Sequence, residues 1–128
     1  IVNIYNCIIV TYEHKLVNEY EKQNAEEIEV YIKEYEEKNK TQVENIAIYT
    51  VTGQNYKTYF KELNRKSVVT YNALRCNWSA DGVINFYTNR NLDTVNINKE
   101  LLQKYLKLEQ DNGYGIINNT LIIECYMY

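Results

Sequence analysis

The chain has 128 residues, of which 45% are hydrophobic and 24% are charged, and its formal net charge at pH 7 is −3. These values are typical of a globular protein and exclude an intrinsically disordered chain. The length corresponds to one domain, residues 1–128. The acidic charge and the presence of only three arginines argue against binding to nucleic-acid backbones, which requires clustered basic side chains. The longest apolar run, residues 7–10, is far shorter than the about 20 residues that span a bilayer, so no membrane partner is expected.

The first part of the chain combines one predicted strand with one predicted long helix. Residues 1–12 (IVNIYNCIIVTY) carry Ile and Val throughout without helical spacing, which predicts a strand buried on much of both faces. Over residues 14–38, apolar side chains recur at spacings of three and four among Glu, Lys and Gln, which predicts a helix. Part of this segment also alternates between apolar and polar residues. A hairpin formed by residues 28–37 and 42–52 therefore stays open as an alternative.

Beyond residue 42, the sequence predicts mainly β structure. Asp81-Gly82 is the strongest hairpin signal, because this dipeptide favours a type I′ turn. Asn98 is expected to cap a short helix near 98–108. The predicted strands span residues 43–52, 56–60, 67–78, 83–87, 92–97 and 120–127.

This order of elements predicts an α+β fold. We expect an antiparallel sheet of five to seven strands, with the long helix of the N-terminal half packed across one face and the short helix near 98–108. NTF2-like and cystatin-like folds share this arrangement, so the predicted architecture resembles them in topology. The resemblance implies a pocket between the helix and a curved sheet, lined by tyrosines and Trp78, that could hold a small molecule.

No group of residues in the sequence predicts a catalytic or metal site. His14 is the single histidine, and the three cysteines lack the short spacings of zinc and redox motifs. We interpret Cys7, Cys76 and Cys125 as small buried side chains, although Cys7 and Cys125 could form a disulfide if the first and last predicted strands pair. The acidic run at residues 26–37 is typical of a solvated helix face. The sequence therefore predicts no catalytic residue, no metal and no cofactor, and it favours a protein that is not an enzyme.

Tyrosine is strongly over-represented, with 14 copies in the chain. Codons rich in A and T encode Tyr as well as the abundant Ile, Asn and Lys, so we attribute most of the excess to an AT-rich genome. Tyrosine is also favoured at binding surfaces, because its ring is apolar and its hydroxyl is polar. The residues that we expect to bind a partner are Tyr56, Tyr59, Tyr71 and Trp78 on the sheet, and Tyr31 and Tyr35 on the acidic helix.

These observations favour a small acidic, non-enzymatic protein-binding module. Its expected partner is another protein, and its expected role is that of an inhibitor, immunity or counter-defence factor from an AT-rich viral or mobile genome, acting in the cytoplasm of the host cell. Homo-oligomers are compatible with this function. The first alternative is the NTF2-like or cystatin-like cone that binds a small molecule. The second is binding of single-stranded nucleic acid through exposed tyrosines that stack on bases beside the lysines of residues 56–66.

Overall fold

The computed structural model describes residues 2–51, 73–108 and 112–126. The predicted strand at 56–60 and the expected binding residues Tyr56, Tyr59 and Tyr71 lie outside this part of the chain. The elements of the described part are α1 (Val2–Asn39), β1 (Asn45–Val51), the 3₁₀ helix η3 (Ala73–Arg75), α2 (Ala80–Thr88), β2 (Asp93–Val95), α3 (Lys99–Leu106), β3 (Tyr114–Ile117) and β4 (Thr120–Tyr126).

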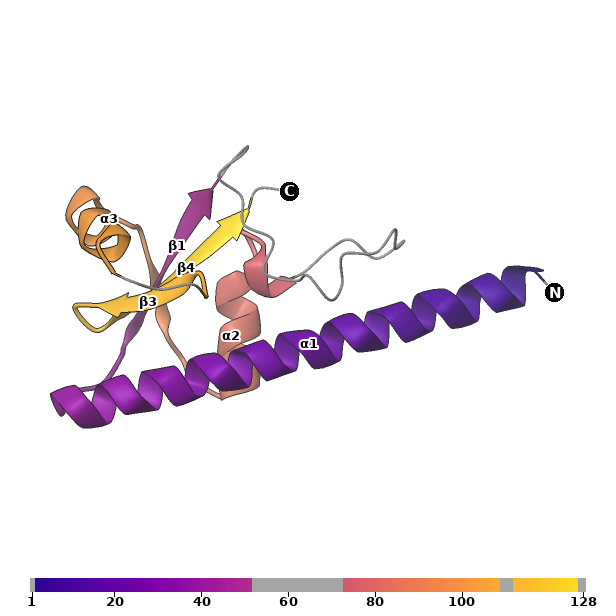
Figure 1. Cartoon of the computed structure of the whole chain (residues 1–128), viewed down its shortest axis with the longest axis horizontal. Helices are drawn as coiled ribbons and strands as arrows, with labels where there is room; N and C mark the ends of the chain where they lie inside the picture. The colour runs from indigo at the N-terminus through magenta and orange to yellow at the C-terminus, as the bar shows by residue number, and fades with distance from the viewer. Residues whose placement is uncertain (1, 52–72, 109–111, 127–128) are drawn as a thin grey trace.

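The described strands form a four-stranded mixed sheet in the order β2-β1-β4-β3. The central strand β1 is parallel to both of its neighbours, and its pairing with β4 extends from Asn45↔Thr120 to Val51↔Tyr126. Among the described strands, only β3 and β4 form an antiparallel pair. In Figure 1, β1 and β4 lie side by side, α1 and α2 lie below them, and α3 lies on the opposite side.

The class is α+β, but the prediction of an antiparallel sheet of five to seven strands is wrong. Parallel neighbours cannot be joined by a tight turn and need a crossover connection, usually a helix. Here α2 lies between β1 and β2 in the chain, where the sequence analysis expected a strand and a hairpin. The predicted resemblance to the antiparallel sheets of NTF2-like and cystatin-like folds is therefore also wrong. The expectation of a small-molecule pocket rested on that resemblance and loses this support.

The segment around Asp81-Gly82 is the first turn of α2, not a hairpin, and residues 83–87 are not a strand. Read with helical spacing, this segment places Ala80 and Ile84 on one face, and both side chains are fully buried. An acidic residue in the first turn also suits the positive end of the helix dipole. Within the predicted strand at 67–78, residues Ala73–Arg75 form the 3₁₀ helix η3, and a turn follows at residues 77–79.

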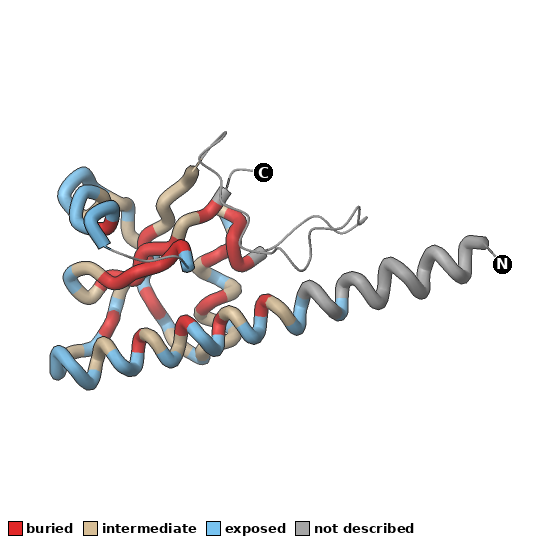
Figure 2. Tube along the Cα trace, viewed as in Figure 1, coloured by how far each residue is buried: buried red, intermediate tan, exposed pale blue. Residues whose placement is uncertain are grey.

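α1 includes residues 14–38, as the helical interpretation predicted, and the hairpin alternative is wrong. The predicted strand at 1–12 is also wrong, because α1 begins at Val2. Extending an existing helix fixes one residue for each hydrogen bond gained, whereas a new strand needs a distant partner. The buried side chains Ala25, Ile28 and Ile32 follow 3–4 spacing in the C-terminal half of α1, where Figure 2 shows its buried positions. The N-terminal half of the helix extends away from the sheet (Figure 1). The disulfide between Cys7 and Cys125 was expected only if the first and last predicted strands pair, and the first of these strands is absent. Cys125 is a free thiol.

Two hydrophobic clusters lie on opposite faces of the sheet. Alternate strand residues, such as Ile46 and Leu121, face α1, α2 and η3 in the larger cluster. Their neighbours Ala47 and Ile122 pack with Tyr105 of α3 in the smaller one. This alternation follows from the two-residue period of a strand. The sheet is therefore the middle of three layers. One outer layer consists of α1 and α2, and the other consists of α3.

The short helix near 98–108 is confirmed as α3, and Asn98 caps it as predicted. The Leu101 backbone N–H donates to Asn98 Oδ1 at 2.8 Å. Gly115 in β3 lies under α3 and the residues that follow it. A Cβ atom at this position would lie 2.8 Å from Leu108 Cδ1 and 3.3 Å from Tyr105 Cε2, so a larger residue would require these side chains to shift.

The turn between β3 and β4 places two asparagines in the left-handed region, with φ of 50° at Asn118 and 60° at Asn119. Positive φ at both central residues is the signature of a type I′ turn, whose twist matches that of the flanking strands. Asparagine tolerates this conformation better than residues without a short polar side chain. The hairpin of the fold is thus at Asn118-Asn119 and not at Asp81-Gly82.

We predict that Asn118→Ala lowers the free energy of unfolding by about 1 kcal/mol, because alanine is disfavoured at positive φ. The matched variant Asn118→Gly should be as stable as the wild type or slightly more stable, since glycine adopts this conformation without strain. Urea-induced unfolding of the three proteins measures both effects. Equal stability of the Ala and Gly variants would contradict the assigned turn.

Candidate functional site

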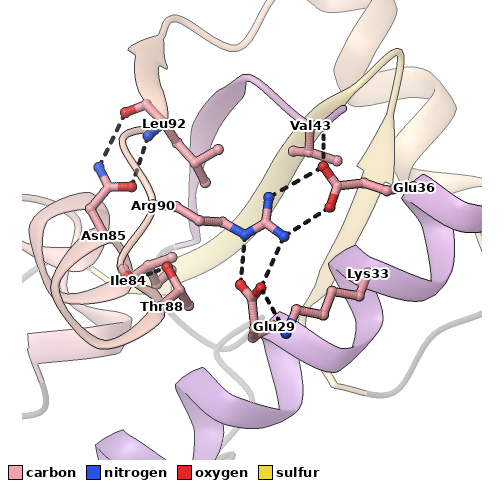
Figure 3. Close-up of polar contacts among 9 residues, drawn as sticks. All are labelled: Glu29, Lys33, Glu36, Val43, Ile84, Asn85, Thr88, Arg90 and Leu92. Carbon is pink, nitrogen blue, oxygen red and sulfur yellow. Dashed lines mark hydrogen bonds and ion pairs between the residues drawn. The ribbon is translucent and has the colours of Figure 1, made fainter. Parts of the chain in front are cut away.

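A densely hydrogen-bonded polar group of the described chain centres on Arg90, which lies between α2 and β2. Its guanidinium binds two carboxylates of α1 (Figure 3): Nε and Nη2 donate to Glu29 at 2.6 and 2.9 Å, and Nη2 and Nη1 donate to Glu36 at 2.8 and 3.2 Å. All three side chains are about four-fifths buried, with exposed fractions of 18–19%. We call this group the Arg90 clamp.

The clamp connects three separate parts of the chain. Glu36 also accepts a hydrogen bond from the Val43 backbone N–H at 2.9 Å, just before β1. The loop that carries Arg90 is held by Asn85, whose side chain donates to the Leu92 carbonyl and accepts from the Leu92 N–H. Because every guanidinium nitrogen donates to a carboxylate, Arg90 is committed to joining α1 to the α2–β2 loop. The group is therefore structural, and we do not assign it to ligand binding.

The clamp also shifts the acid–base equilibria of its members. Hydrogen bonding to Arg90 holds the pKa of Glu36 below its ordinary value of 4.5, although burial acts in the opposite direction. The same hydrogen bonds, to Glu29 and Glu36, raise the pKa of Arg90 further above its ordinary value. The charged form of the clamp is thus the stable one near neutral pH.

A second arginine, Arg75 of η3, is buried and joins η3 to the β3–β4 region. It donates to the carbonyl oxygens of Asn112 at 2.6 Å, Gly113 at 2.9 Å and Glu124 at 3.3 Å, and its guanidinium carbon lies 5.9 Å from the centre of the Tyr114 ring. A guanidinium over an aromatic face is a favourable cation–π contact. Arg75 thus stabilises the end of the sheet where β3 begins.

The side chains of two cysteines lie in the described part of the chain. Cys76 and Cys125 are both free and fully buried, and burial raises the pKa of Cys125 to about 12. A nucleophilic cysteine needs a lowered pKa, so Cys125 is suited to packing. In the described ranges, no three His, Cys, Asp or Glu side chains lie close enough together to hold a metal ion. The same ranges contain no helix long and apolar enough to cross a membrane.

Two of the tyrosines expected to bind a partner, Tyr31 and Tyr35, pack inward. The ring of Tyr31 contacts Tyr114 edge-on at 5.3 Å between centroids. The Tyr35 hydroxyl donates to Asn119 Oδ1 at 3.2 Å. Both rings pack against the larger hydrophobic cluster. Their role in the described structure is to attach α1 to the β3–β4 hairpin.

Trp78, also expected to bind a partner, is 66% exposed, and Phe86 of α2 is 78% exposed. Gly82 lies midway between them in the sequence and is exposed as well. On a helix, Gly82 and Phe86 are one turn apart and lie opposite the buried Ile84. Phe86 also contacts Tyr87 edge-on, at 5.2 Å between ring centroids. We call Trp78, Gly82 and Phe86 the α2 outer face.

Sequence reasoning missed Phe86 as a candidate, because the segment was interpreted with the two-residue period of a strand. A helical reading of ADGVINFYT would have placed Ala80, Ile84 and Tyr87 on one side and Gly82 and Phe86 on the other. That spacing is the only sequence signal that could have identified the α2 outer face.

Comparison with known proteins does not add to this picture. The sequence matches no protein-family model, and no curated protein or solved structure is significantly similar to it.

We predict that Arg90→Met lowers the free energy of unfolding by about 1–3 kcal/mol, because it leaves Glu29 and Glu36 partly buried without their cation. Lys33→Met is the matched control. The Lys33 side chain is exposed and lies 3.8 Å from Glu29 as an i,i+4 pair on α1, and ion pairs with an exposed cation of this kind contribute less than about 0.5 kcal/mol. Urea unfolding at pH 7 compares the variants, and similar losses for both would contradict the structural role of the clamp.

The stabilising effect of the clamp should decrease in acid. Because the pKa of Glu36 is lower in the folded than in the unfolded state, its contribution is complete above the ordinary value of 4.5 and is lost as the pH falls through the folded pKa. The stability gap between the wild type and Arg90→Met should therefore narrow between pH 7 and about pH 3. Unfolding curves at several pH values measure this gap. A gap that stays constant would show that Arg90 does not act through ionised carboxylates.

Proposed function

We propose that this chain is a non-enzymatic protein-binding module whose contact surface is the α2 outer face. The observation that carries the proposal is the exposure of two large aromatic rings, Trp78 and Phe86, on one short helix and its entry turn. Aromatic residues are the commonest energetic centres of protein interfaces, because they bury a large area at low cost in side-chain entropy. Large aromatic side chains are otherwise mostly buried in a folded domain.

The chemistry of the α2 outer face favours a protein over a nucleic acid as the partner. Asp81 is the single charged residue of α2, and its carboxylate accepts hydrogen bonds from the Gly82 N–H at 2.9 Å and the Thr94 hydroxyl at 2.6 Å. Proteins that stack bases on aromatic rings combine those rings with a basic groove. Among the residues of α2 there is no Lys or Arg.

The α2 outer face is held on a rigid support, which reduces the entropy lost on binding. On the inner side, Ala80 and Ile84 are buried in the larger cluster. At the C-terminal end, the Thr88 hydroxyl donates to the Ile84 carbonyl at 2.6 Å. The Arg90 clamp begins two residues later and joins this end to α1.

The finer form of the proposal is an inhibitor, immunity or counter-defence factor. It is supported by the small size and acidic charge of the chain. An inhibitor of this kind acts by occupying a surface of its target, for which two fixed aromatic anchors are sufficient chemistry.

Capture experiments with matched variants test the proposal. The full-length tagged chain, Trp78→Ala, Phe86→Ala and the control Leu106→Ala are each incubated with lysate of cells that express the chain. Leu106 lies on α3, across the sheet, and is 58% exposed. We expect a protein captured in stoichiometric amount by the wild type and the control, and at least about ten-fold less by both aromatic variants. Equal capture by all four proteins, or no stoichiometric partner for any, would refute the proposal.

A further inference from the structure

We propose that the dipeptide Asn112-Gly113 is a site of spontaneous deamidation, at which Arg75 accelerates the conversion of Asn112 to aspartate or isoaspartate. The dipeptide lies directly before β3 and includes no residue of the α2 outer face, so the inference is independent of the proposed function. Three features carry it: an exposed asparagine, a glycine directly after it, and a buried guanidinium bound to the carbonyl oxygen between them.

The reaction takes place within one dipeptide and needs only water. The Gly113 nitrogen loses its proton and attacks Cγ of Asn112, so that a succinimide ring closes. The bond between Cγ and Nδ2 breaks, and the side-chain nitrogen leaves as ammonia with the proton that Gly113 lost. Water then opens the ring at Cγ to give aspartate, or at the main-chain carbonyl carbon to give isoaspartate. Attack within one dipeptide is favoured because the reacting groups are already close together.

The two residues have the surroundings that this reaction requires. Asn112 is exposed, so water can reach the ring. Gly113 has a φ of 76°, a left-handed conformation that favours glycine. Because glycine has no Cβ atom, nothing on this residue hinders the approach of Cγ to its nitrogen. Asn118 is exposed too, but Asn119 follows it and carries a side chain. The sequence contains one Asn-Gly dipeptide, and it lies here.

Arg75 supplies the electrostatic part of the argument. Its Nη2 donates to the Asn112 carbonyl oxygen at 2.6 Å. This oxygen belongs to the same peptide group as the Gly113 nitrogen, and it takes up negative charge when that nitrogen loses its proton. A hydrogen bond from a cation to the atom that becomes negative stabilises the charged form. Arg75 is 2% exposed, so water screens this interaction weakly. The reactive, deprotonated peptide group is therefore favoured at this position.

The products change a region that Arg75 holds together. The Gly113 carbonyl oxygen accepts from Arg75 Nη1 at 2.9 Å and from the Glu124 N–H at 2.8 Å. Isoaspartate lengthens the backbone between the two carbonyl oxygens that Arg75 binds, so both hydrogen bonds cannot keep their geometry. We therefore expect the isoaspartate form to unfold at a lower urea concentration than the unmodified chain. Deamidation is then a slow, one-way change that loosens the start of β3.

Incubation of the full chain near neutral pH tests the inference, with conversion at Asn112 followed by mass spectrometry of proteolytic fragments. A synthetic peptide of residues 110–116 gives the rate of the same dipeptide without Arg75. The folded wild type should convert at least as fast as this peptide, whereas a fixed backbone without a catalytic group reacts more slowly because ring closure needs motion. Arg75→Met should convert at least about ten-fold more slowly than the wild type.

Arg90→Met is the matched control, because it removes an arginine that binds carboxylates of α1 and leaves the Asn112-Gly113 dipeptide unchanged. It should convert at the wild-type rate. Urea unfolding shows whether Arg75→Met is folded. If this variant is unfolded, its rate should equal that of the peptide, and the comparison of wild type with peptide then decides.

Two results would overturn the inference. One is conversion in the folded wild type that is slower than in the peptide. The other is a folded Arg75→Met variant that converts as fast as the wild type, because the guanidinium would then have no part in the reaction. Neither result bears on capture of a partner through Trp78 and Phe86.

Discussion

The bidentate binding of Arg90 to both Glu29 and Glu36 is the interaction on which the arrangement of this protein depends. The larger hydrophobic cluster favours packing of α1 on the sheet, but hydrophobic contact is non-directional and does not by itself select one position of the helix along the sheet. A planar guanidinium between two carboxylates about two helical turns apart does select one position of the helix, because its hydrogen bonds require one geometry. The bond from Val43 to Glu36 then places the start of β1 relative to the same point of α1.

The position of α2 follows from this constraint and from the parallel pairing of the sheet. Since β1 is parallel to β2, the chain between them has to return along one face, and α2 lies on the face that α1 covers. The Arg90 clamp holds its C-terminal end against α1, and Ala80 and Ile84 face inward. The outward side of α2 is then determined by geometry. Phe86 is exposed because the same helix has to bury Ile84.

The parts of the fold that were predictable are those with strong local signals. The Glu- and Lys-rich helix over 14–38, the strand that ends the chain and the Asn98 cap each depend on propensity and spacing within a few residues. The sheet was not predictable, because parallel pairing joins β1 to strands more than 40 residues away and leaves no local pattern. The segment 1–12 failed for a different reason, since a short apolar run without periodicity fits a strand and a buried helix equally well.

Asp81-Gly82 shows most clearly why local reasoning assigned the wrong secondary structure to this segment. The dipeptide is favourable in a type I′ turn, but Asp is equally favourable in the first turn of a helix. The choice between the two depends on whether Ala80 and Ile84 find a core to enter, which is a tertiary property. Once this segment was interpreted as a hairpin, Phe86 became a strand residue among many aromatics and Gly82 became a turn residue.

The change of this segment from a hairpin to a helix also changes the interpretation of the aromatic residues. The sequence expected a binding surface from the number of tyrosines, yet Tyr31 and Tyr35 connect α1 to the β3–β4 hairpin. The number of tyrosines does not locate a binding surface, because a tyrosine at a core-facing position of a helix contributes to packing. What distinguishes Phe86 is its position opposite Ile84 on a helix that the Arg90 clamp and the core hold in place. A helix that is fixed on its inner side by charge and apolar contacts can present its outer side at little further entropic cost, and this rigidity supports the proposal that the α2 outer face binds a partner.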